Sequence, residues 1–86
     1  MQILDLAGGG ASLEFASAEA PAVLKGLRKL GAVRTEQGAM YDGFELEGEH
    51  LIYYFEWDEP CLISSTAGGV AILRKLAAEL THLRAA

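Results

Sequence analysis

Hydrophobic residues near the start of the chain recur at every second position. The recurring residues are Leu4 and Leu6, followed by Leu13 and Phe15. A period of two is typical of strands with one buried face. The glycines at 8–10 separate the two groups and favour a tight turn. The pattern therefore predicts a hairpin of two strands.

The spacing changes to three and four residues in two later segments, which are predicted to be helices. The first has its apolar face at Val23, Leu24, Leu27 and Leu30. Pro21 suits its first turn, Ser17 or Ala20 is its cap, and Gly31 favours its end. The second helix is predicted at Gly69–Leu83, where the apolar side chains fall within an arc of ~120°. Its apolar face consists of Val70, Leu73, Leu76, Ala77 and Leu80.

Between the two helices, apolar and polar residues alternate again, with turn residues between the runs. The pattern predicts three or four strands, at Ala32–Gln37, Met40–Glu47, His50–Trp57 and Cys61–Thr66. The predicted turns are Gly48-Glu49 and residues 58–60.

The order of elements is therefore ββαββββα over residues 1–86, which we expect to form a single domain. We predict an α+β two-layer sandwich, an antiparallel sheet of five or six strands with two helices on one face. This order resembles the layout of the TATA-binding-protein-like fold, in which a helix precedes four strands and a second helix closes the domain. The resemblance concerns element order alone. It implies nothing about DNA, because the exposed sheet face is expected to be acidic.

The two predicted turns fix which strand residues share a face. The first turn pairs Phe44 with Tyr53, and the second pairs Trp57 with Cys61. The side chains expected in the core are Phe44, Leu46, Leu51, Tyr53, Phe55, Trp57, Cys61 and Ile63, with Asp42 as the one misfit. If either turn is one residue longer, part of this assignment inverts.

The opposite face combines carboxylates, tyrosines and aliphatic side chains. Its expected members are Tyr41, Glu45, Glu47, His50, Ile52, Tyr54, Glu56, Leu62 and Ser64. Tyrosine with aliphatic neighbours is more typical of a recognition surface than of a sheet that faces water. All but Ser64 are predicted to bind a partner, which is either a second copy in a homodimer or a basic protein. The alternative is an ordinary solvent-facing sheet with a few exposed apolar residues.

Charge is distributed unevenly along the chain. The 12 acidic residues outnumber the 7 Lys and Arg, so the formal net charge is −5. No Lys or Arg occurs from Thr35 to Leu73, a stretch that holds eight of the acids. This balance argues against nucleic acid as a partner. Six of the basic residues form two clusters in the predicted helical segments, with the last of them directly after the second helix: Lys25, Arg28 and Lys29, then Arg74, Lys75 and Arg84. The two sides of the molecule are therefore expected to differ in charge.

The apolar runs and the cysteine content bear on location. No run reaches the ~20 apolar residues of a membrane helix, so no membrane contact is predicted. Residues 1–5 lack the basic region of a secretory signal. The single cysteine, Cys61, excludes an intrachain disulfide and favours the reducing cytoplasm.

The sequence shows no recognisable catalytic set. Cys61 is the one candidate thiol nucleophile, and in the predicted register His50 lies about 23 Å from it, too far to act as its base. Glu45, Glu47 and His50 could bind a divalent cation weakly, but no His-x-x-x-His spacing supports such a site. We therefore predict no catalytic residue, no metal site and no cofactor.

The start of the second helix is another place where a ligand could bind. Ser65 or Thr66 is the predicted cap, and Gly68 and Gly69 follow, where free backbone amides favour anions. The segment lacks the lysine of nucleotide-binding loops. Thr66, Gly68 and Gly69 are accordingly candidates for weak anion binding, with simple capping as the alternative.

Taken with its charge, the sequence favours a small acidic, non-enzymatic interaction module. One alternative is a small-ligand-binding or weakly catalytic domain that uses Cys61, Ser65 and Gly68 at the sheet–helix edge. The other is an accessory subunit that completes a larger assembly.

Overall fold

The computed structural model describes residues 1–55 and 59–85, with side chains up to Thr81. The described strands are β1 (Gln2–Asp5), β2 (Ala11–Glu14), β3 (Val33–Gln37), β4 (Tyr41–Leu46), β5 (Glu49–Tyr54) and β6 (Cys61–Ser64). The described α-helices are α1 (Ala20–Leu30) and α2 (Ala67–Ala85), and single 3-10 turns lie at Ala7–Gly9 and Ser17–Glu19.

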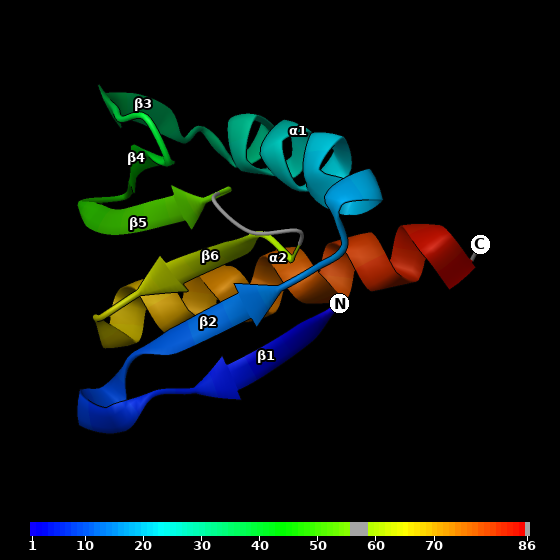
Figure 1. Cartoon of the computed structure of the whole chain (residues 1–86). Coiled ribbons are helices and arrows are strands. Elements are labelled where there is room, and N and C mark those ends of the chain that lie inside the picture. Colours follow the sequence, from blue (N-terminus) through cyan, green and yellow to red (C-terminus); the bar gives the residue numbers. More distant parts are fainter. Residues whose placement is uncertain (56–58, 86) are drawn as a thin grey trace.

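The strands form one sheet in the order β1-β2-β6-β5-β4-β3, and all neighbours run antiparallel. In Figure 1, α2 runs behind β2 and β6, and α1 lies above them. Side chains from both helices and from the sheet meet in one core. The predicted α+β sandwich, with an antiparallel sheet and two helices on one face, is therefore confirmed.

The N-cap of helix α1 is Glu19 rather than the predicted Ser17 or Ala20, whereas Pro21 and Gly31 lie where they were predicted. Pro21 occupies the first turn, where its missing amide hydrogen leaves no helical bond unmade. At the other end, Gly31 adopts a left-handed φ of 103°. Its amide donates to Arg28 O at 3.0 Å, and the amide of Ala32 donates to Leu27 O at 3.0 Å. The chain then turns back into β3.

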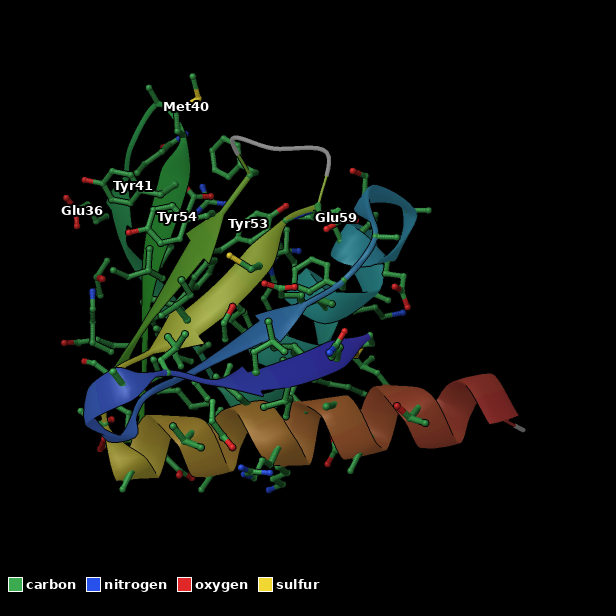
Figure 2. The ribbon with its side chains drawn as sticks, turned by 60° about the horizontal axis from the view of Figure 1, so that its bottom comes forward. Glu36, Met40, Tyr41, Tyr53, Tyr54 and Glu59 are labelled. Carbon is green, nitrogen blue, oxygen red and sulfur yellow. The ribbon has the colours of Figure 1, made fainter. Side chains whose placement is uncertain are left out.

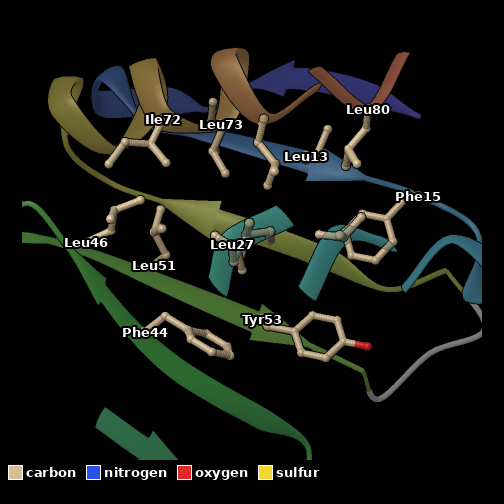
Figure 3. Close-up of a cluster of buried hydrophobic side chains, with 14 residues drawn as sticks. Leu13, Phe15, Leu27, Phe44, Leu46, Leu51, Tyr53, Ile72, Leu73 and Leu80 are labelled. Carbon is tan, nitrogen blue, oxygen red and sulfur yellow. The ribbon is translucent and has the colours of Figure 1, made fainter. Parts of the chain in front are cut away.

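The core fills the space between the sheet and the helices (Figure 3). Its buried members are Ala11, Leu13, Phe15, Val23, Leu27, Phe44, Leu46, Leu51, Tyr53, Leu62, Ile72, Leu73, Leu76 and Leu80. The helices approach closely at Gly26, where a Cβ would lie 2.7 Å from Leu76 Cδ1. Phe15 stacks on Tyr53, with the ring centroids 6.1 Å apart. Burial of this apolar set is the main source of stability for so short a chain.

The hairpin between β4 and β5 has a different turn from the predicted one. Glu47 and Gly48 are the turn residues, with φ of 53° and 79°. Phe44 consequently lies opposite Leu51 rather than Tyr53. Two-residue hairpin turns with both φ positive favour glycine at the second position, which is where Gly48 lies. Because the register shifts by two residues, an even number, the side chains within β4 and β5 keep their predicted faces. Phe55, predicted in the core, follows the end of β5 and is 38% exposed, and Trp57 lies outside the described residues.

The predicted register of β6 is wrong, and its side chains exchange faces. Ile63 lies opposite Ile52, three residues from the predicted Phe55. An odd shift turns every side chain of a strand to the other side. Leu62 therefore points into the core and is 0% exposed, so it is not a surface residue. Cys61, predicted in the core, is half-buried on the opposite face.

Pairing with β2 explains this register. Leu13 lies opposite Leu62 in the core, and Phe15 N donates to Pro60 O at 3.2 Å just beyond the strand. β5 accordingly ends at Tyr54 and β6 begins at Cys61, so the two strands are not paired as the predicted three-residue turn requires. The length of a turn after β5 carries no information on this pairing with β2.

Candidate interaction surface

The sheet face that points away from the helices is called the open face below. Cross-strand pairs assign to it Gln2, Leu4, Ser12, Glu14, Val33, Glu36, Tyr41, Gly43, Glu45, His50, Ile52, Tyr54, Cys61 and Ile63. The predicted partner-binding residues found there are Tyr41, Glu45, His50, Ile52 and Tyr54. Glu47 is exposed in the turn after β4, Leu62 is in the core, and Glu56 lies outside the described residues.

An apolar row crosses the middle of the open face. Leu4, Ser12, Ile63, Ile52 and Gly43 are successive cross-strand partners on neighbouring strands. Leu4 is 36% exposed, and Ile52 and Ile63 are half-buried. Ser12 and Gly43 are buried between and beside them. The three aliphatic side chains thus give the open face an apolar centre.

Two tyrosines lie side by side next to this row. Tyr41 and Tyr54 are cross-strand partners, with ring centroids 6.1 Å apart and ring planes at 45°. The Tyr41 hydroxyl donates to Glu36 Oε1 at 2.7 Å, and Figure 2 shows the three side chains together, on the far side of the sheet from α2. This hydrogen bond and the charge of Glu36 raise the pKa of Tyr41. Glu36 therefore orients the Tyr41 ring and keeps its phenol protonated.

His50 and Glu45 form a cross-strand pair toward the other end of β4 and β5. Both side chains are exposed. His50 leans over Gly43, since a Cβ on Gly43 would lie 3.3 Å from His50 Cε1. The predicted partner of His50 was Glu47, and the observed turn replaces it with Glu45.

Cys61 lies between Glu14 and Tyr54, its cross-strand partners on the open face. Burial raises the pKa of its thiol, a hydrogen bond from Ser12 offsets part of that effect, and the charge of Glu14 adds to it. His50 is four residues from Tyr54 along β5, about 13 Å, too far to act as a base. The thiol is therefore protonated and weakly nucleophilic at neutral pH.

The open face carries carboxylates, at Glu14, Glu36 and Glu45, but no Lys or Arg among the side chains that the structure describes. The described basic side chains on the helices are Lys25, Arg28, Lys29, Arg74 and Lys75. Arg34 points to the helix side, opposite Phe44, with its Nη2 3.9 Å from Asp42 Oδ2. Asp42, the one misfit predicted in the core, thus has a partner.

The start of α2 holds a carboxylate that belongs to the chain itself. Gly69 N donates to Thr66 Oγ1 at 3.0 Å, as expected of a capping residue. Thr66 Oγ1 in turn donates to Glu49 Oε1 at 2.6 Å. The same carboxylate lies against Gly68, where a Cβ would be 2.6 Å from Glu49 Cδ. Glu49 therefore lies beside the residues predicted to bind an anion, near the positive end of the helix dipole.

The residues of the alternative ligand site are not brought together. Cys61 begins β6 and Ser65 follows its last residue, so about 13 Å of strand separates them. A hollow of about 270 Å³ lies near the start of β1, lined by Met1, Gln2, Glu14, Phe15, Ala16, Glu19 and Glu59. Neither Cys61, Ser65 nor Gly68 lines this hollow. Within the described residues, no three His, Cys, Asp or Glu converge to hold a metal ion.

The predicted partner-binding set omitted several residues that belong to the open face. The main ones are Leu4, Glu14, Glu36, Cys61 and Ile63. Glu14 alternates with Leu13 and Phe15, so the period of two already placed it opposite the core. Cys61 and Ile63 could be placed only with the observed register of β6.

Comparisons of the chain with protein-family models, with curated proteins and with solved structures gave no match. Among the helices that the structure describes, none is both long and apolar enough to cross a membrane. What the chain does must therefore be inferred from its own surface.

Proposed function

We propose that the protein is a non-enzymatic interaction module whose open face binds a basic surface of another protein. The composition of that face carries the proposal. Its apolar row and its tyrosine pair supply contact area of the kind enriched in interfaces. The carboxylates around them attract positive charge, and no Lys or Arg among the described open-face residues opposes it. Complementary charge gives a partner both fast association and specificity.

A second copy of the chain fits this face less well. A symmetric dimer places one patch against the same patch of its partner. Glu14, Glu36 and Glu45 of one copy would then share the interface with the same three carboxylates of the other. Like charges brought together across an interface cost several kcal/mol. A basic partner replaces that repulsion with attraction.

Charge reversal on and off the open face tests the proposal. The immobilised protein first captures binding proteins from a native extract, and the captured protein is then purified. Its affinity is measured by calorimetry for two variants with the same change in net charge. Glu45→Lys alters the open face, and Glu79→Lys alters an exposed position on α2. We expect Glu45→Lys to weaken binding about tenfold and Glu79→Lys to leave it unchanged.

An equal loss of affinity in both variants would contradict the proposal, because net charge rather than the open face would then govern binding. Recovery of this chain itself, as a dimer that Glu45→Lys dissociates, would replace the basic partner with a second copy.

A further inference from the structure

We propose that Tyr41, Tyr54 and Glu36 form a site for an arginine side chain of the partner. This inference rests on the proposed function, and it names the chemical group that the open face recognises. The site lies where β3, β4 and β5 are neighbours, on the face away from α2 (Figure 2).

The tyrosine pair has the geometry to hold one cation. Both side chains are half-buried, so part of each ring is exposed. A cation is attracted to an aromatic face within about 6 Å of the ring centroid. The two centroids are 6.1 Å apart. A single cation placed over the pair can therefore lie within that distance of both rings.

Glu36 adds a charge at the edge of the pair. Its Oε1 accepts the Tyr41 hydroxyl hydrogen at 2.7 Å, which fixes the carboxylate beside the ring. A carboxylate can accept several hydrogen bonds. Glu36 can therefore also accept from a guanidinium that lies over the rings, and it neutralises the positive charge.

The chain's own cations lie elsewhere, as far as its side chains are described. Arg34 is the one basic residue of β3, and it points to the helix side, toward Asp42. The other described Lys and Arg residues are on α1 and α2. The cation for this site must consequently come from a partner.

Arginine fits the site better than lysine. Its guanidinium is planar, stacks on aromatic faces and donates several hydrogen bonds in its plane, whereas the ammonium of lysine is a compact, strongly hydrated charge.

Nuclear magnetic resonance of the tyrosine rings tests the inference with a defined probe. The chain has three tyrosines, so ring-labelled protein gives a simple spectrum. The probe is a blocked tripeptide with a central arginine, compared with the same peptide carrying citrulline, a neutral isostere, or lysine. We expect the arginine peptide to shift the Tyr41 and Tyr54 signals in a saturable way. Tyr53, which is 7% exposed in the core, is the internal reference and should not shift.

Matched variants distinguish the contribution of the tyrosine rings to binding from that of the Glu36 charge. Tyr54→Leu and Glu36→Gln should each weaken binding of the arginine peptide about two- to fivefold. Tyr54→Phe keeps the ring and should bind as the unmodified protein does. Glu79→Gln removes an exposed carboxylate of α2, outside the open face, and should have no effect. Amide spectra of each variant confirm that it is folded.

Equal shifts with the arginine and citrulline peptides would overturn the inference, as would equal affinity for the lysine peptide. The captured partner distinguishes this failure from failure of the proposed function. If Glu45→Lys lowers the partner's affinity and Tyr54→Leu does not, the arginine site is wrong and the open face remains the interface. If neither variant lowers it, the proposed function fails.

Discussion

The environment of Cys61 decides whether its thiol can act in chemistry. The side chain is half-buried among Ser12, Glu14 and Tyr54. Burial, with the charge of Glu14, raises the pKa of the thiol. A raised pKa leaves less thiolate at every pH below it, and the thiolate is the reactive form.

Alkylation kinetics check this environment. We expect iodoacetamide to modify Cys61 more slowly in the folded protein than in urea at about pH 8. In the folded protein the rate should continue to rise with pH to a higher pH than it does in urea before it levels off. A folded-state rate at or above the rate in urea would contradict this account of Cys61.

Glu47 has a backbone conformation that suits another residue better. Its φ of 53° lies in the left-handed region, which asparagine and glycine adopt more readily than glutamate. We expect Glu47→Asn to raise the free energy of unfolding by about 1 kcal/mol, measured by urea denaturation. Glu45→Asn, in the neighbouring strand, is the control and should not stabilise. An unchanged or lowered stability for Glu47→Asn would show that the turn is not of the proposed type.

Among the elements, β6 shows why local sequence patterns could not predict which face of a strand is buried. Its four residues are all compatible with either face, since Cys61 and Ile63 are as apolar as Leu62. A period of two therefore cannot show which face of β6 points into the core. The choice is made by β2, which pairs with β6 across about fifty intervening residues of sequence and places Leu13 opposite Leu62. By contrast, the helices carried their own signals, at Pro21, Gly31 and Thr66.

The start of α2 is packed so closely that one of its two glycines is required. A Cβ on Gly69 would overlap Ser64 Oγ and lie 2.6 Å from Ser64 Cβ, and Ser64 is buried. A Cβ on Gly68 would meet only the end of the Glu49 side chain, which can move. The two glycines therefore differ in function although they are adjacent in sequence.

Alanine substitution tests this difference. We expect Gly69→Ala to lower the free energy of unfolding by about 2 kcal/mol, because the overlap outweighs the better helix propensity of alanine. Gly68→Ala should cost little, since alanine favours the helix there and Glu49 gives way. Thermal unfolding of both variants provides the comparison, and equal losses at the two positions would contradict the packing described for α2.

For the whole molecule, the two layers differ in charge as the sequence predicted. The described Lys and Arg residues lie on the helices or on the helix side of β3, and the open face carries Glu14, Glu36 and Glu45. The run without Lys or Arg from Thr35 to Leu73 covers β4, β5 and β6. The positions of the charged residues along the sequence were therefore enough to predict the difference in charge between the two layers. The exact membership of the open face needed the register of β6.

Light scattering tests whether this face binds a second copy. We expect the mass of one chain, 9.2 kDa, at about 0.15 M and at about 1 M salt. At the lower salt concentration, repulsion between carboxylates opposes self-association. At the higher salt concentration that repulsion is screened, but three aliphatic side chains form too small an apolar centre to drive self-association. A dimer at both concentrations that Ile52→Lys dissociates would show that the second copy is the partner.

The most direct test of the open face uses the four isoleucines of the chain, because they lie on both sides of the sheet. Ile52 and Ile63 lie on the open face, whereas Ile3 lies on the helix side of the sheet and Ile72 lies in α2. In a complex with the purified partner, saturation is transferred from the partner to isoleucine methyl groups within contact range. Our account predicts loss of intensity at Ile52 and Ile63 and none at Ile3 and Ile72. Loss at Ile3 or Ile72, with Ile52 and Ile63 unaffected, would contradict it.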